Sequence, residues 1–350
     1  MLIQCPRLCT TALTVPLVYR ILAFHAIISG LKYVNRQLQP AVASLFIEKT
    51  GMKCYNVIEV TDMTIRESNE RILTLLGDYL CFTPDAVRPE EVDAFATARR
   101  VPLNEAYIAC LTAYLAPDPD SGDALLLREL LPRIIHNEAP DIYLNDAYMH
   151  AIRPVSGSCG TIELLRETLR PMELFISDDF QRDVAGHVFP QLGWFSGAFI
   201  FPALCEDGRP WMTVTPNEIN TIRPAIRESR GKVLTYGLGL GYYAFHSLLK
   251  PEVTSVTVVE KSPHVIEVFR RLLLPHFPHP EKLRILQADA FEYAAHTAPI
   301  EGYDVVFTDI WRDVADGLPL YRRMKAIHDV HPGPLYLYWM EPTLRCYDSD

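Results

Sequence analysis

Short apolar runs alternate with amphipathic segments over the last third of the chain. The apolar runs predict five strands, at 232–236, 255–260, 283–287, 303–308 and 335–338. The segments between them predict helices, including those at 263–274 and 320–328. Apolar strands that alternate with helices are typical of a parallel sheet covered on both faces. We therefore expect an α/β fold over residues 231–350: a doubly wound, Rossmann-like parallel sheet of about five strands in the order 3-2-1-4-5.

The preceding part of the chain has a helical pattern. Pro89, followed by Glu90 and Glu91, is typical of a helix start, because proline fits the first turn and acids favour the positive end of the helix dipole. Further helices are expected at 103–115 and 124–135, separated by a turn rich in Pro, Asp and Gly. These segments predict a mainly helical N-terminal domain over residues 1–160.

Between these parts lie short apolar runs interrupted by Gly and Pro. The runs 199–204 and 211–214 flank an Asp-Gly pair, which is a strong signal for a β-hairpin. A short helix is expected at 217–229. Residues 161–230 are therefore predicted to be a β-hairpin lead-in to the parallel-sheet domain.

The charge of the chain limits the classes of partner. Lys and Arg number 33 against 43 Asp and Glu among 350 residues, a formal net charge of −10. Nucleic-acid binding depends on clustered basic charge, so we expect no nucleic-acid partner. The expected partner is a small-molecule substrate, and a homo-oligomer is compatible with the sequence.

The most apolar stretch lies near the start of the chain. Its longest uncharged runs, 8–19 and 21–31, are shorter than the roughly 20 residues of a membrane-spanning helix, and no secretory cleavage site clearly follows. We expect no membrane association, and a true start at Met52 is an open alternative. The eight cysteines are scattered without a CxxC pair, which favours a reducing cytoplasm and no metal site.

The residues that carry chemistry follow the predicted strands. Gly237, Gly239 and Gly241 lie between the first strand and the first helix, where glycines allow a ligand to approach backbone amides and a helix N-terminus closely. Glu260 ends the second strand, where an acid can accept hydrogen bonds from both ribose hydroxyls of a nucleoside. Tyr242 occupies the position of the third glycine of a dinucleotide motif, which argues against NAD.

Two further acids follow the third and fourth strands. Asp289 either accepts from an adenine amino group or caps the next helix. Asp309 ends an apolar strand, where a carboxylate needs a ligand or a basic partner such as Arg312. Ligands of parallel sheets bind beyond the carboxyl ends of the strands, and all of these residues lie there.

Over about residues 211–338 the chain resembles the class I S-adenosylmethionine-dependent methyltransferases, particularly their spermidine-synthase-like branch. The segments GLGLG, VVEKS, ADAF and FTDIW resemble the methionine-and-ribose loop, the ribose-binding acid, the adenine-side acid and the strand-four acid; WMTVTPNE resembles the lead-in segment. The resemblance implies S-adenosylmethionine as cofactor. It implies a set of cofactor-binding residues: Tyr236, Gly237, Leu238, Gly239, Gly241, Glu260, Lys261, Asp289, Ala290 and Asp309.

The same resemblance gives the expected activity, methyl transfer to a small molecule, with Asp309 and Asp313 as candidate bases. The spermidine-synthase branch has a second carboxylate three residues after Asp309, but this chain has Arg312 there, and a cation would repel a polyamine. An aminopropyltransferase and a non-catalytic nucleoside-binding or scaffold protein are the alternatives. The two strands that usually close the sheet are not found after residue 338, so the hairpin or the N-terminal domain is expected to cover that edge.

Overall fold

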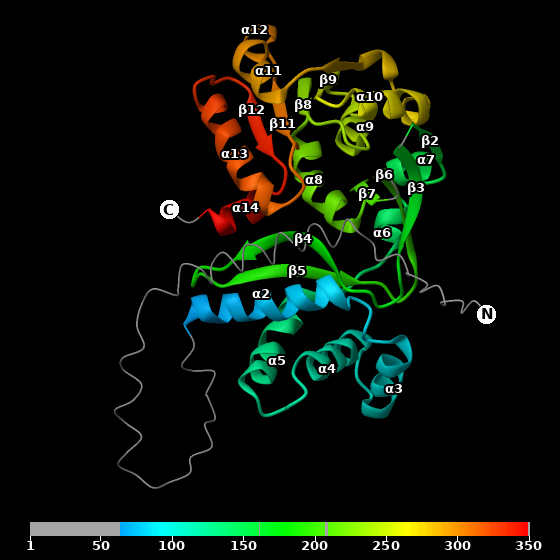
Figure 1. Cartoon of the computed structure of the whole chain (residues 1–350), viewed down its shortest axis with the longest axis vertical. Coiled ribbons are helices and arrows are strands. Elements are labelled where there is room, and N and C mark those ends of the chain that lie inside the picture. The colour runs from blue at the N-terminus through cyan, green and yellow to red at the C-terminus, as the bar shows by residue number, and fades with distance from the viewer. Residues whose placement is uncertain (1–63, 161, 207–208, 349–350) are drawn as a thin grey trace, which may run out of the picture.

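The computed structural model describes residues 64–160, 162–206 and 209–348. The apolar stretch near the start and the alternative start at Met52 lie outside these residues. Figure 1 shows a helical part at one end, the parallel sheet with its helices at the other, and β4 (Phe175–Arg182) and β5 (Val188–Trp194) between them. None of the described helices has the length and apolar character needed to cross a membrane.

The helical part begins with a helix that the sequence pattern did not predict. Helix α2 (Ile65–Phe82) starts at Thr64, whose side chain accepts a hydrogen bond from the amide of Glu67, and the Glu67 carboxylate bonds back to the Thr64 amide. This capping box satisfies two amides at once. The predicted helices follow, with two short ones: α3 (Pro89–Arg99), α4 (Leu103–Leu115), α5 (Gly122–Ile134), α6 (Asp141–Leu144) and α7 (Ala147–Ile152).

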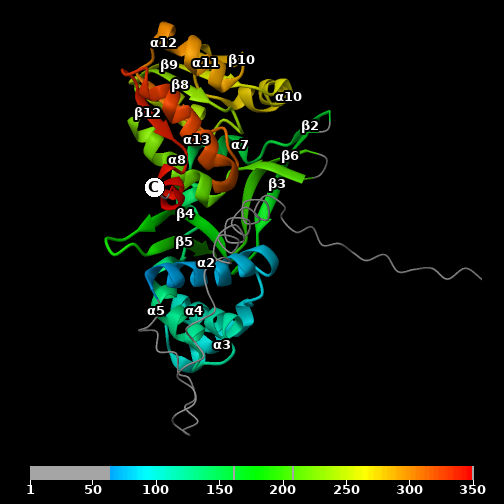
Figure 2. The ribbon, with the colours of Figure 1, turned by 60° about the vertical axis from the view of Figure 1, so that its left-hand side comes forward.

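The strands from β1 to β7 form two small sheets, where a single hairpin was expected. One sheet has the order β1-β5-β4, and the other has the order β2-β3-β6-β7. The predicted hairpin is the antiparallel pair β6–β7 of the second sheet, and Figure 2 shows this sheet extending to one side. The strands are β1 (Ile135–Asn137), β2 (Gly157–Cys159), β3 (Ile162–Leu169), β4 (Phe175–Arg182), β5 (Val188–Trp194), β6 (Phe199–Glu206) and β7 (Arg209–Thr213).

The large sheet has five strands, all parallel, which confirms that part of the prediction. Its observed order is β10-β9-β8-β11-β12. The strands are β8 (Gly231–Tyr236), β9 (Val253–Glu260), β10 (Leu283–Gln287), β11 (Val305–Thr308) and β12 (Leu335–Tyr338). The helices of this part are α8 (Pro216–Glu228), α9 (Tyr242–Leu249), α10 (Pro263–Val268), α11 (Ala290–His296), α12 (Ala298–Glu301), α13 (Val314–Asp329) and α14 (Glu341–Tyr347).

The two faces of the large sheet are buried in separate apolar cores. Val233 and Phe307 belong to the core that contains α8, α9 and α10. Leu234 and Val306, which point to the opposite face, belong to the core that contains α11 and α13. Alternate residues of one strand therefore face different helices, as a doubly wound sheet requires. The predicted helix at 263–274 is α-helical over Pro263–Val268 and continues as a π-helical turn over Phe269–Leu273.

Of the two parts expected to cover the β12 edge, the hairpin does not pair with it. It pairs with β3, and β12 has only β11 as a strand neighbour among the described residues. After β12 the chain turns into α14, which packs against β4. The hydroxyl of Thr343 in α14 accepts a 2.9 Å hydrogen bond from the Phe180 amide of β4. The C-terminal helix thus fastens the parallel-sheet part to the sheet that covers the helical part.

Candidate functional site

The glycine loop connects β8 to α9 at the carboxyl end of the sheet. Gly237, Gly239 and Gly241 all have positive φ, at 92°, 51° and 80°. The amide of Gly237 donates to the carbonyl of Val259 at 2.9 Å, which draws the loop against the neighbouring strand. A Cβ at Gly237 would lie 1.9 Å from the backbone oxygen of Asp309. Only glycine fits this position, and the turn leaves loop backbone facing the crevice.

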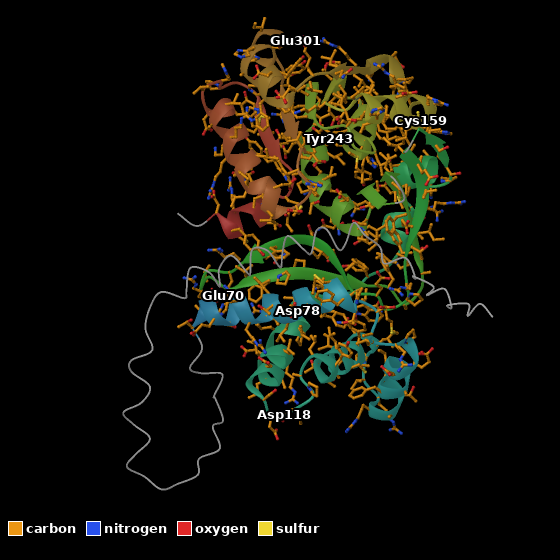
Figure 3. All side chains as sticks on the ribbon, in the orientation of Figure 1. Glu70, Asp78, Asp118, Cys159, Tyr243 and Glu301 are labelled. Atoms are coloured by element: carbon orange, nitrogen blue, oxygen red, sulfur yellow. The ribbon has the colours of Figure 1, made fainter. Side chains whose placement is uncertain are left out.

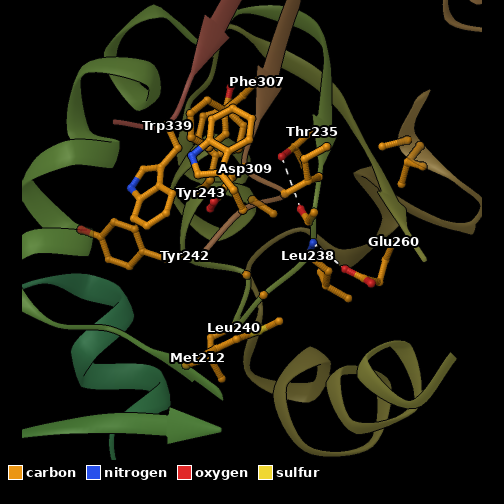
Figure 4. A pocket seen from close by; sticks show the side chains of 18 of the residues that line it. Met212, Thr235, Leu238, Leu240, Tyr242, Tyr243, Glu260, Phe307, Asp309 and Trp339 are labelled. Atoms are coloured by element: carbon orange, nitrogen blue, oxygen red, sulfur yellow. Dashed lines mark hydrogen bonds between the residues drawn. The ribbon is translucent and has the colours of Figure 1, made fainter. Parts of the chain in front are cut away.

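Glu260 binds the loop from the end of β9. Its Oε2 accepts a 3.0 Å hydrogen bond from the amide of Leu238, drawn as a dashed line in Figure 4, and its Oε1 accepts a 2.7 Å bond from the amide of Ser262. An ionised carboxylate offers about four lone-pair sites, so two such bonds leave acceptor capacity for ligand hydroxyls. The carboxylate is therefore held in one orientation and retains capacity for a ligand.

Asp289 performs the capping role that the sequence offered as one of two alternatives. Its Oδ1 accepts from the amides of Phe291 and Glu292 at the start of α11, and its Oδ2 accepts from Lys261 Nζ at 3.3 Å. Burial alone would raise the pKa of Asp289, but the hydrogen bonds from Glu292, Lys261 and Phe291 outweigh it and lower the pKa. An ionised acid beside the crevice remains able to meet a ligand donor.

These residues line one cavity of about 940 Å³. The cavity lies at the carboxyl ends of the strands, where the fold places ligands. Nine of the predicted cofactor-binding residues contribute to its wall: Gly237, Leu238, Gly239, Gly241, Glu260, Lys261, Asp289, Ala290 and Asp309. Within the part of the chain that the structure describes, no cluster of three or more His, Cys, Asp or Glu could hold a metal ion.

Two predicted residues do not line the cavity. The side chain of Tyr236 is fully buried in the core below α11 and α13, and only its carbonyl, which accepts from the amide of Asp309, is near the loop. Asp313 is the N-cap of α13 and forms a capping box with Asp316. Burial and the neighbouring Asp316 raise the pKa of Asp313. Its carboxylate accepts from the amides of Ala315 and Asp316 at the helix start.

The other half of the cavity has aromatic and acidic walls. In Figure 4, Trp339 and Tyr242 lie on the side opposite Glu260, with Phe307 and Tyr243 near them. Tyr243 lies inside the parallel-sheet part, as Figure 3 also shows. Trp339 was not among the residues predicted from the sequence, although it directly follows β12, just as Asp309 directly follows β11.

Charged side chains complete this second half. Glu218, in the first turn of α8, is only 7% exposed and lines the cavity. Arg312 forms an ion pair with Asp316, with Nε and Oδ2 3.4 Å apart, and both residues belong to the wall. The cation that was expected to repel a polyamine is therefore partly neutralised by an adjacent carboxylate.

The chain has no matching family model, and no curated protein matches it significantly. Among solved structures, it is similar to spermidine synthase from Thermotoga maritima, with 21% identity and a TM-score of 0.25 over 44% of this chain and 45% of that chain. It is similar to spermidine synthase in complex with the transition-state analogue AdoDATO, with 17% identity and a TM-score of 0.33 over 55% and 62% of the two chains. A third similar structure is MnmC2 from Aquifex aeolicus, with 17% identity and a TM-score of 0.24 over 67% of each chain. The first two matches thus cover less than two thirds of those proteins.

Proposed function

We propose that this protein binds S-adenosylmethionine in the cavity and transfers its methyl group to a small molecule. The observation that carries the proposal is the meeting of the glycine loop with Glu260 and Asp289 at one wall of a single cavity. The three features come from separate strand ends, and each suits contact with a nucleoside ligand. The loop offers backbone amides, Glu260 can accept from ribose hydroxyls, and Asp289 can accept from a base amino group. The scattered cysteines add a cytoplasmic location to the proposal.

The second half of the cavity would hold the acceptor. Methyl transfer depends mainly on proximity and in-line geometry, and a base is needed only where the acceptor loses a proton. Asp309 is the candidate base, because it lies in the wall between the glycine loop and the aromatic half. The walls formed by Trp339 and Tyr242 would exclude water and orient the acceptor.

Aminopropyl transfer from the decarboxylated cofactor is the second candidate. It is favoured by the pairing of Arg312 with Asp316 and by the buried acid Glu218, since both reduce the positive charge that an amine would meet. The two activities use the same nucleoside subsite, but their donors differ: S-adenosylmethionine has a carboxylate that the decarboxylated form lacks. The relative affinities of the two donors therefore distinguish the two activities.

The test is calorimetric titration of the whole protein with S-adenosylmethionine, its demethylated product, the decarboxylated form and NAD. Glu260→Ala is the test variant. Glu267→Ala is the matched control, because the Glu267 side chain is 56% exposed, pairs with Arg271 and is not part of the cavity wall. Thermal unfolding of each variant shows that it is folded.

Micromolar binding of the first two ligands, lost in Glu260→Ala and kept in Glu267→Ala, is the expected result. Tighter binding of the decarboxylated form would favour aminopropyl transfer. Binding of none of the four ligands would overturn the proposal and favour a non-catalytic scaffold.

A further inference from the structure

The glycine loop is fixed from outside the parallel-sheet part, by the short helix α7. The hydroxyl of Tyr148 donates a 2.7 Å hydrogen bond to the backbone carbonyl of Leu240, inside the loop. Tyr148 is fully buried, and its ring makes edge contacts with the rings of Tyr242 and Phe245, at centroid distances of 5.2 and 5.3 Å. Among the described residues, the acceptor of this buried hydroxyl is the loop carbonyl of Leu240.

Asp146, the N-cap of α7, binds the start of α9 at the same junction. Its Oδ2 accepts a 2.9 Å hydrogen bond from the hydroxyl of Tyr242, and its Oδ1 lies 3.0 Å from Nε2 of His246. The same Oδ1 accepts from the amide of Tyr148 at 2.9 Å. One carboxylate thus joins the first turn of α7 to the first turn of α9, and Tyr242 is itself part of the cavity wall.

The electrostatics of this carboxylate favour a fixed contact. Burial acts to raise the pKa of Asp146, but the hydrogen bonds and charge from His246, together with the Tyr242 hydroxyl, outweigh it and lower the pKa. Asp146 therefore remains ionised, and hydrogen bonds to an ionised acceptor are stronger than neutral ones. Only 9% of its side chain is exposed, so water competes little for these donors.

A loop of this kind needs external support. Gly237, Gly239 and Gly241 have no side chains that could hold the backbone in place, and glycine loses more conformational freedom on ordering than any other residue. Within the described loop, the amide of Leu238 is held by Glu260 and the amide of Gly241 by the carbonyl of Leu238. The carbonyl of Leu240 is held by Tyr148.

We infer that Asp146 and Tyr148 are positioning residues, which hold the glycine loop and Tyr242 in the arrangement that receives the ligand. The ligand part of this inference rests on the proposed function. The part that concerns the order of the loop in the ligand-free protein does not rest on the proposed function, and loop order is measured separately. The upstream segment thereby contributes to the site without touching the ligand.

The test compares Tyr148→Phe with Tyr143→Phe. Both variants remove one hydroxyl from a buried, hydrogen-bonded tyrosine of the same core, but the hydroxyl of Tyr143 contacts Glu138 and Asn220 and has no bond to the loop. The two variants should therefore lose similar stability in thermal unfolding. Hydrogen exchange of the backbone amides at 237–245 reports loop order, and calorimetry with S-adenosylmethionine reports affinity.

Tyr148→Phe is expected to speed exchange at 237–245 and to weaken binding about fivefold, the equivalent of one typical hydrogen bond, whereas Tyr143→Phe changes neither. Equal exchange in the two variants would overturn the inference, and so would faster exchange with unchanged affinity. If the parent protein binds no nucleoside, the proposed function fails, and the exchange comparison alone decides whether Tyr148 orders the loop.

Discussion

The Cα of Gly237 lies so close to the carbonyl oxygen of Asp309 that a Cβ there would be only 1.9 Å away. This contact joins the loop after β8 to the residue that directly follows β11, the strand next to β8 in the sheet. The contact brings a strand-end acid and the glycine loop together in one cavity wall, with no side chain between them.

Gly237→Ala is expected to lower the free energy of unfolding by about 3 kcal/mol or more, because the Cβ meets backbone rather than a flexible side chain and φ is 92°. Gly239→Ala is the matched control. Its Cβ would have Met212 Sδ as nearest neighbour, at 3.7 Å, so we expect a cost of only about 1 kcal/mol from the left-handed backbone. Chemical denaturation of both variants measures the difference. Equal losses would show that the approach to Asp309 relaxes easily.

Substitutions of Asp309 and of Asp313 are expected to have different effects, the first on the rate of transfer and the second on stability. For an acceptor that must lose a proton, Asp309→Asn should slow transfer by about 100-fold or more, since a positioned base contributes on this scale. Asp313→Ala should leave the rate unchanged and cost about 1 kcal/mol of stability, the usual cost of losing an N-cap. Single-turnover rates and denaturation curves test both. A large rate loss in Asp313→Ala with normal stability would assign the base to Asp313.

The parallel sheet was predictable because its central strands β8, β9 and β11 are largely buried on both faces, so that they contain continuous apolar runs such as Val305–Phe307. The glycine loop, Glu260 and Asp309 were predictable because they follow those runs directly. Tyr236 also follows this rule, but a strand-end side chain points to one face only, and that of Tyr236 points away from the cavity.

The small sheets were harder to predict because their strands are irregular. The β4 strand contains Asp178 and Asp179, and its pairing with β5 shifts register on either side of Asp178. No alternation of apolar and polar residues survives such shifts. The contacts between α7 and α9 were also not predictable from the sequence pattern, since Asp146 and Tyr242 are 96 residues apart in sequence. By contrast, the capping box at the start of α2 could have been found from Thr64 and Glu67 alone.

Asp179 should make the folded protein less stable as the pH rises. Burial raises its pKa to about 6, against an ordinary value of 3.8, and its Oδ1 accepts from the Thr343 hydroxyl at 2.5 Å. Between pH 3.8 and 6 the folded state then holds more protons at this site than the unfolded state, so stability falls as the pH rises across that window.

Asp179→Asn keeps an acceptor for Thr343 and removes the ionisation. The variant should be more stable than the parent at pH 7, by up to about 3 kcal/mol, and equal to it near pH 4. Denaturation at both pH values tests this, and a constant difference between the proteins would contradict it.

His328 should have the opposite effect. Its ring is buried, stacks on Tyr336 at a centroid distance of 4.0 Å, and shares a 2.8 Å hydrogen bond through Nδ1 with the Tyr338 hydroxyl. Burial lowers its pKa from 6.5 to about 4, so between these values the unfolded state binds more protons and stability is lost as the pH falls.

In His328→Phe this loss should disappear. The parent should lose about 1–2 kcal/mol more than the variant between pH 7 and pH 5. Because Asp179 and His328 act in opposite directions between pH 4 and 6, each single variant should reveal the slope of the other residue, and the double variant should show neither. Urea denaturation of the four proteins at intervals of pH measures these slopes. If the stabilities of the parent and of His328→Phe change in parallel with pH, the folded protein accommodates the protonated ring despite its burial among the stacked tyrosines.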